Sequence, residues 1–176
     1  MRPGLALIYS DLGLEPEARA LFEQLAEYDF ADLAQDALRV GTIAYLSEVC
    51  AFLGDTARAA ILYRLLSPYV GHNVIMGFAA ACYGAASHYL GLLAATMSLW
   101  KEAETHFLDA LEMNARIGAK PYLAQTQYRY AGMLLQRSQA GDQTNAMALL
   151  DEALASSKEL RMIPLAEKLE ALRSKT

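Results

Sequence analysis

The sequence has few signals of extended structure. It contains no run of alternating Val, Ile or Thr residues and no Asn-Gly or Asp-Gly pair that would predict a tight hairpin turn. Apolar residues recur at helical spacing instead. Hydrophobic residues make up 55% of the 176 residues and charged residues 20%, a balance typical of globular rather than disordered proteins. The sequence therefore predicts a single all-α domain with a full hydrophobic core.

Cysteine and histidine are also scarce. Cys50 and Cys82 lie in apolar segments without CxxC spacing, which predicts buried, reduced thiols and a cytoplasmic protein. The N-terminal apolar run is too short for a secretory leader. None of the three histidines, His72, His88 and His106, has a histidine or cysteine partner three or four residues further on. We therefore expect no metal site.

Motifs for catalysis and for phosphate binding are missing from the sequence. There is no GxxxxGK[ST] and no GxGxxG segment. Paired carboxylates such as Glu102 and Glu104 are expected at helix starts or on polar faces, where they interact with the helix dipole. We expect a protein that is not an enzyme and that binds no cofactor.

Basic side chains are scarce in the first half of the chain. Residues 1–88 contain five basic and ten acidic side chains, and residues 89–176 contain ten of each, for a net charge of −5. A nucleic-acid surface needs a positive face that contacts phosphates. Direct binding of DNA or RNA is therefore not expected.

The longest segment without charge runs from Leu65 to Trp100. Most of it, residues 74–97, is predicted to form one long central helix around which the rest of the chain packs. Gly77, Gly84 and Gly91 recur every seventh residue. Glycine destabilises a helix by about 1 kcal/mol relative to Ala, so this stripe indicates close packing against a neighbouring helix.

A membrane span is the alternative interpretation of this segment, because it requires about 20 apolar residues. Asn73, Ser87 and His88 are polar, and the segment is rich in Ala and Gly rather than in Leu and Ile. The flanking segments are amphipathic. A buried central helix is therefore favoured, and no membrane partner is expected.

The helical segments are predicted to come in pairs. The pairs cover about 5–27, 37–66, 74–117 and 121–160, and a last helix over 164–173 is predicted to cap the array. Gly54 is expected to end one helix and Asp55 to cap the next. Ser98 is expected to cap the helix over 99–117. Proline, which is tolerated in a first helical turn, begins three segments, at Pro16, Pro121 and Pro164.

The second helices of the pairs share a pattern of one small and then one large apolar residue. The small residues are Ala18, Ala57, Ala103 and Ala146, and the large ones, four positions later, are Phe22, Ile61, Phe107 and Leu150. The spacing of the alanines is 39, 46 and 43 residues. A helix pair cannot bury both of its sides alone, so such units are predicted to stack into a curved solenoid.

This pattern resembles the tetratricopeptide repeat. The third pair carries Leu90-Gly91, with Ala103 twelve residues after that glycine, followed by Phe107 and Ala110. The first pair has Leu5-Ala6, Tyr9, Ala18 and Phe22 at the same offsets. The resemblance implies a tetratricopeptide-like α-solenoid of about four helix pairs with a C-terminal capping helix.

The third and fourth pairs, over residues 89–154, also resemble the C-terminal repeat regions of large bacterial ATPase-linked regulators. LuxR-type activators and ATPase-coupled nucleotide cyclases belong to this group. The resemblance implies a regulatory arm in signalling or transcription regulation, with an NTPase domain in the same full-length chain.

Two binding functions are therefore expected, and the sequence leaves both open. The first is a non-catalytic scaffold for a protein or peptide, and the alternative is a module that senses a small molecule in its concave groove. Tyrosines on the first helices of pairs three and four are suitable anchors for a peptide. The candidate groove residues are Glu48, His88, Leu92, Thr96, Arg129, Met133, Gln136 and Arg137.

The first predicted helix carries more apolar residues than one inward face needs. Leu5, Leu7, Ile8 and Leu12 follow each other within one short segment. This pattern predicts that the chain is a fragment of a longer protein, and that the fragment forms a homodimer through residues 5–25.

Overall fold

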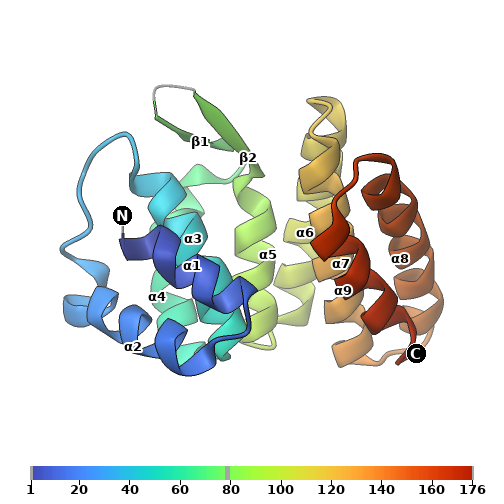
Figure 1. Ribbon diagram of the computed structural model, residues 1–176, viewed down its shortest axis with the longest axis horizontal. Coiled ribbons are helices and arrows are strands. Elements are labelled where there is room, and N and C mark those ends of the chain that lie inside the picture. Colours follow the sequence, from blue (N-terminus) through green and yellow to red (C-terminus); the bar gives the residue numbers. More distant parts are fainter. Residues whose placement is uncertain (1, 78–79, 176) are drawn as a thin grey trace.

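The computed structural model describes residues 2–77 and 80–175. Over these residues the chain forms nine α-helices and one two-stranded sheet, so it is mostly helical as predicted (Figure 1). The helices are α1 (Arg2–Asp11), α2 (Glu15–Leu25), α3 (Arg39–Leu53), α4 (Thr56–Leu66), α5 (Ala86–Thr96), α6 (Trp100–Arg116), α7 (Lys120–Arg137), α8 (Asp142–Glu159) and α9 (Ile163–Arg173). Short 3₁₀ segments cover Glu27–Phe30 and Ser67–Tyr69.

The predicted central helix over 74–97 is wrong in its first half. The chain there forms strands β1 (Asn73–Met76) and β2 (Ala81–Ala85), which pair antiparallel, and α5 begins only at Ala86. Residues 78 and 79 of the predicted helix lie outside the described residues. The strands are only four and five residues long, too short to give an alternating pattern in the sequence.

The backbone of two glycines explains this error. Gly77 and Gly84 have φ angles of +62° and +74°, which belong to turns and irregular strands and not to a right-handed helix. Gly91 alone of the three lies inside a helix. There it packs on α6, as the close-packing argument predicts, because a Cβ at this position would lie 2.9 Å from Cδ1 of Phe107.

Helix α5 joins two hydrophobic cores. Its residues from Ala86 to Ala94 are all buried. Leu90 and Leu93 belong to the core formed with α1 to α4, whereas Leu92 contributes to the core formed with α6 to α9. The second half of the predicted central helix therefore does organise the rest of the fold.

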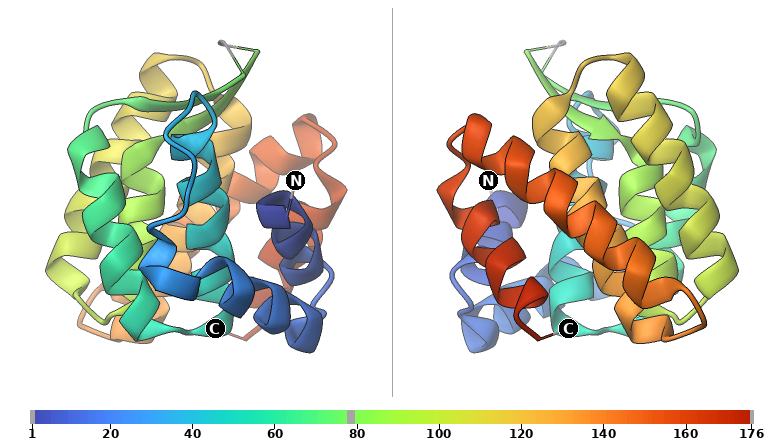
Figure 2. Two further views of the ribbon diagram at one scale, coloured as in Figure 1. Left: turned by 90° about the vertical axis from the view of Figure 1, so that its left-hand side faces the viewer. Right: turned by 90° about the vertical axis from the view of Figure 1, so that its right-hand side faces the viewer.

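Helices that follow each other along the chain pack against each other. Helix α1 packs on α2 and α3, helices α3 and α4 pack on α5, and each helix from α5 to α8 packs on the next (Figure 2). Three of the four predicted alanines, Ala18, Ala103 and Ala146, are fully buried. In the second pair the prediction is wrong, because Ala57 is exposed and Ala59 is buried instead.

The helix ends agree with most of the predicted caps. Gly54 ends α3 with a φ of +66°, and the Asp55 carboxylate accepts a hydrogen bond of 3.0 Å from the backbone N–H of Arg58. The prediction that Ser98 caps α6 is wrong. Ser98 has a φ of +58°, and Leu99 is the residue that precedes α6. Over the described residues, no helix is long and apolar enough to cross a membrane.

Candidate functional site

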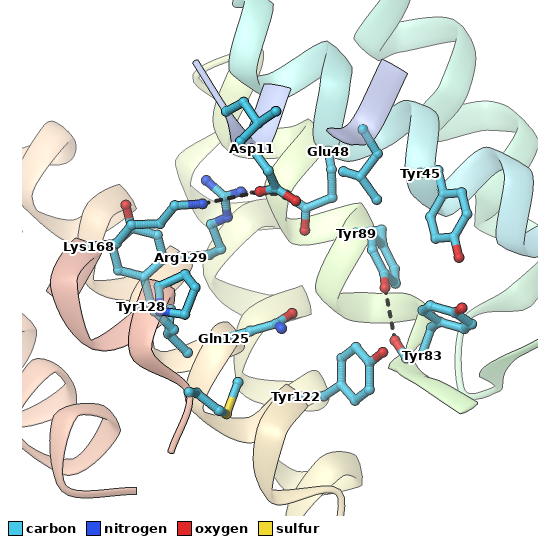
Figure 3. A pocket seen from close by; sticks show the side chains of 15 residues that line it. Asp11, Tyr45, Glu48, Tyr83, Tyr89, Tyr122, Gln125, Tyr128, Arg129 and Lys168 are labelled. Atoms are coloured by element: carbon cyan, nitrogen blue, oxygen red, sulfur yellow. Dashed lines mark hydrogen bonds and ion pairs between the residues drawn. The ribbon is translucent and has the colours of Figure 1, made fainter. Parts of the chain in front are cut away.

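Helices from both halves of the chain surround a cavity of about 650 Å³ (Figure 3). Residues of α1, α3, β2, α5, α7 and α9 line it. We call it the tyrosine pocket, because its lining includes Tyr45, Tyr83, Tyr89, Tyr122 and Tyr128. Apolar side chains of α1 and α9 line it as well, among them Leu7 and Leu165.

One end of the tyrosine pocket is aromatic. The ring of Tyr83 lies edge-on to Tyr45 and to Tyr122, with centroids 5.4 and 6.2 Å apart. The hydroxyl of Tyr89 donates a hydrogen bond of 2.9 Å to the backbone oxygen of Tyr83. Burial raises the pKa of Tyr122 to about 12 and raises the pKa of Tyr45 and Tyr89 further. These hydroxyls are therefore neutral at physiological pH.

The other end of the pocket is charged. Arg129 of α7 donates a short hydrogen bond from Nη2 to the carboxylate of Glu48 on α3. The same guanidinium lies over the ring of Tyr128, 5.5 Å from its centroid. Burial alone would raise the pKa of the Glu48 carboxyl, but Arg129 and His88 lower it to about 2. Gln125 lies between the charged end and the tyrosines (Figure 3).

An ion pair links helices α1 and α9 at the edge of the tyrosine pocket. Nζ of Lys168 on α9 lies 3.1 Å from Oδ1 of Asp11 on α1. Both side chains are about half exposed, and such pairs contribute roughly 1 kcal/mol or less. The ion pair is a contact between α1 and α9, two helices that are far apart in the sequence.

A second hollow of about 550 Å³ lies between α5 and α7, and we call it the α5–α7 groove. It shares Tyr128 and Arg129 with the tyrosine pocket. Trp100 also lines it. Of the eight candidate groove residues from the sequence, the structure brings five together here: Leu92, Thr96, Arg129, Met133 and Gln136.

The other three candidates lie elsewhere. Glu48 lines the tyrosine pocket. His88 is buried behind it, with Nδ1 3.0 Å from Oγ1 of Thr126 and Nε2 3.2 Å from Oε1 of Glu48. Arg137 lines neither hollow, because its guanidinium binds the carboxylates of Glu104 and Asp142, with shortest distances of 2.7 Å.

Several lining residues were not among the sequence candidates. Tyr83, Tyr89, Tyr122 and Tyr128 stood out only as tyrosines on the expected groove helices. Gln125 and the residues of α1 and α9 gave no signal, because their place in the lining depends on the approach of α1 to α9. These helices are far apart in the sequence, so no local pattern indicates that they meet.

The cysteines differ from each other. Cys50 is buried, and burial raises the pKa of its thiol to about 12, so it is an inert core residue. Cys82 on β2 is exposed, contrary to the prediction. Within the described residues, no group of three or more His, Cys, Asp or Glu side chains is placed to hold a metal ion.

No family model, curated protein or solved structure matches this chain. The resemblance to tetratricopeptide repeats and to ATPase-linked regulators therefore stays a prediction from the residues. The function has to be argued from the geometry of the two hollows.

Proposed function

We propose that this protein is a non-catalytic binding module that takes up a small molecule in the tyrosine pocket. The observation that carries the proposal is a cavity of about 650 Å³ lined by helices from both halves of the chain. Small-molecule sites occupy about 300–1,000 Å³ and combine apolar walls with a few polar groups. The tyrosine pocket has this size and this composition.

The pocket also lacks the pairing that acid–base or nucleophilic chemistry needs. Glu48 is its most buried carboxylate, and it is bound on one side by Arg129 and on the other by His88. A carboxylate with a pKa of about 2 is a poor general base at neutral pH. The neutral tyrosine hydroxyls support binding rather than catalysis.

A peptide or protein partner in the α5–α7 groove is the second candidate function. The groove is open, and Trp100, Leu92 and Met133 give it an apolar floor beside the polar Gln136. Aromatic and Arg side chains of this kind are frequent anchors in protein interfaces. Arg129 lines both hollows, so occupation of one would affect the other.

We further propose that the helices form a short tetratricopeptide-like solenoid that serves as the regulatory arm of a larger cytoplasmic protein. The stacking of consecutive helices and the buried Ala18, Ala103 and Ala146 support this arrangement. A ligand held between α1 and α9 would fix the distance between them. In a chain with an attached NTPase domain, this is how binding would be sensed.

Two matched variants separate the two candidate functions. Gln125→Trp fills the tyrosine pocket and Gln136→Trp fills the α5–α7 groove, with the same substitution on the same helix. A metabolite library is screened for compounds that raise the melting temperature of the wild type. We expect the active compounds to fail with Gln125→Trp and to bind Gln136→Trp normally.

The opposite outcome assigns the function to the groove. Compounds or peptides that bind Gln125→Trp as they bind the wild type, but fail with Gln136→Trp, would contradict the small-molecule proposal. Circular dichroism and chemical denaturation show that both variants are folded before binding is compared.

A further inference from the structure

The hydrogen bonds behind the tyrosine pocket determine which atoms of His88 carry hydrogen. The side chain of Asn114 is fixed first, because its Oδ1 accepts a bond of 3.0 Å from the backbone N–H of Ala85. Its Nδ2 therefore donates to Oγ1 of Thr126, at 3.2 Å. The single hydroxyl hydrogen of Thr126 goes to the backbone oxygen of Tyr122, at 2.7 Å.

Thr126 can consequently only accept from His88. A hydroxyl has one hydrogen and two lone pairs, and the hydrogen is already used, so Nδ1 of His88 donates the bond of 3.0 Å. Nε2 faces Oε1 of Glu48 at 3.2 Å, and an ionised carboxylate only accepts. The contacts of His88 with Thr126 and Glu48 are both satisfied when both ring nitrogens carry hydrogen, and the ring is then a cation.

This assignment leaves the charged end of the pocket with an excess of positive charge. The carboxylate of Glu48 lies between two cations, His88 and Arg129, so the cluster has a net charge of one positive unit. The other charged residues that line the pocket, Asp11 and Lys168, form an ion pair with each other. The excess charge is therefore not balanced by the rest of the lining.

Arg129 is the group through which this charge reaches the cavity. The side chain of His88 is 2% exposed and that of Arg129 is 33% exposed. Arg129 uses Nη2 for Glu48 and its face for Tyr128, and over the described residues its Nη1 and Nε make no hydrogen bond. A planar guanidinium with free N–H groups is suited to a carboxylate, which it binds through two parallel hydrogen bonds.

We propose that the tyrosine pocket selects a small aromatic carboxylate, with the carboxylate on Arg129 and the ring among Tyr45, Tyr83 and Tyr122. In Figure 3, Arg129 lies on one side of Gln125 and Tyr83 and Tyr122 lie on the other, which matches a ligand with one acidic end and one aromatic end. Aromatic rings prefer the edge-on contacts that these tyrosines already make with each other. This inference rests on the proposed function of the same pocket.

Three probes of nearly equal size test the sign of the charge. Phenylacetate, phenylacetamide and phenethylamine share one aromatic ring and differ in carrying a negative, a neutral or a positive end. Titration calorimetry of the wild-type protein is expected to give phenylacetate an affinity at least about tenfold above phenylacetamide, with no binding of phenethylamine. This comparison does not depend on the folding of any variant.

Three substitutions then locate the interaction. Arg129→Gln is expected to remove the preference for phenylacetate over phenylacetamide, and Arg129→Lys to keep part of it. Arg64→Gln, the same charge change at an exposed position of α4, should leave the preference unchanged.

The outcomes that overturn the inference differ from those that overturn the proposed function. Stronger binding of phenylacetamide or phenethylamine, when it is lost in Gln125→Trp, would refute the selection of an anion but keep the pocket as a ligand site. Absence of phenylacetate binding at millimolar concentration, or an unchanged preference in Arg129→Gln, would also refute it. Phenylacetate binding that Gln125→Trp does not affect would count against the pocket itself.

Discussion

Gly91 of α5 lies against the ring of Phe107 of α6, so closely that a Cβ on Gly91 would be 2.9 Å from Cδ1 of that ring. Real Cβ atoms do not approach side chains to this distance without displacement. Phe107, the large residue of the third pair, thus occupies the space that Gly91 leaves without a side chain. This contact gives a physical reason for the Leu-Gly and Phe spacing of the third pair.

Gly91→Ala is expected to destabilise the protein, because the ring of Phe107 must move in a packed core. Overpacking of this kind costs about 1–3 kcal/mol. Gly132→Ala is the control, since a Cβ on Gly132 of α7 would find only Cδ2 of Leu172, at 4.0 Å. In that position Ala should be neutral or stabilising by up to about 1 kcal/mol. Equal free energies of unfolding for the two variants in urea would contradict the close contact.

Gly84→Ala is expected to disturb the tyrosine pocket as well as the backbone. Its φ is +74°, and a Cβ would lie 2.8 Å from Cβ of Tyr122. Gly118→Ala has a similar φ of +68° but meets no atom within 4 Å. Both variants have a backbone cost of about 1–2 kcal/mol, and only Gly84→Ala displaces Tyr122. Urea unfolding should show the larger loss for Gly84→Ala, and a loss no greater than that of Gly118→Ala would be evidence against this contact.

Arg137→Gln is expected to lower the stability at neutral pH, because the guanidinium of Arg137 binds the carboxylates of Glu104 and Asp142. The sequence had predicted that Arg137 lines the groove instead. Hydrogen bonds from Arg137 lower the pKa of both Asp142 and Glu104 below their usual values of 3.8 and 4.5. A lowered carboxyl pKa stabilises the fold above the usual value, and this contribution disappears as the pH falls.

The stability difference between the wild type and Arg137→Gln should therefore shrink as the pH is lowered through 4.5 and 3.8. Chemical denaturation at several pH values measures it, with Arg64→Gln as the control for the charge change. A difference that does not vary with pH would mean that Arg137 does not bind these carboxylates.

His88 and His106 are expected to differ in protonation. The contacts of His88 with Thr126 and Glu48 are satisfied together when both ring nitrogens carry hydrogen. Burial lowers the pKa of His106, whose Nε2 lies 2.8 Å from the hydroxyl of Tyr63, so this ring should be neutral at pH 7. Nitrogen-15 NMR of the two rings distinguishes these states. A neutral His88 would remove the excess charge on which the anion selectivity depends.

Apolar side chains at α1 are exposed, so we still expect the fragment to form a homodimer through this region. Leu5 and Ile8 are 42% and 54% exposed, and Leu12 is 67% exposed. Sedimentation is expected to show a dimer that Leu5→Glu with Ile8→Glu dissociates. Leu108→Glu, at a residue 52% exposed on α6, should leave it intact. A monomer at high concentration, or a dimer that Leu108→Glu dissociates instead, would exclude this face.

Local signals in the sequence predicted the helices but not the sheet. Gly54 and Asp55 give a helix end and a helix cap that residue type alone specifies. Gly77 and Gly84 do not specify one structure by residue type alone, because glycines seven residues apart are compatible with one face of a helix as well as with two separate turns. Ala57 and Ala59 were likewise ambiguous in the sequence, and the contacts of α4 with α3 and α5 determine which of them is buried.

The candidate site was only partly predictable, because local signals do not show which distant helices come together. Leu92 and Thr96 share one face of α5, and Arg129, Met133 and Gln136 share one face of α7, because helical spacing places them there. The tyrosine pocket requires the approach of α1 to α9. Buried partners, such as Thr126 for His88 and Asp142 for Arg137, also have no local signature.

The ion pair between Lys168 and Asp11 spans 157 residues of sequence. The pocket has a complete wall only after α9 has been synthesised and has packed, so under the proposed function a nascent chain would offer the ligand an incomplete site. After folding, local unfolding of either α1 or α9 would open this wall, and its frequency would set an upper limit on how long a ligand stays bound. A ligand that binds only the closed form in turn slows the opening of both helices and protects their backbone amides from hydrogen exchange.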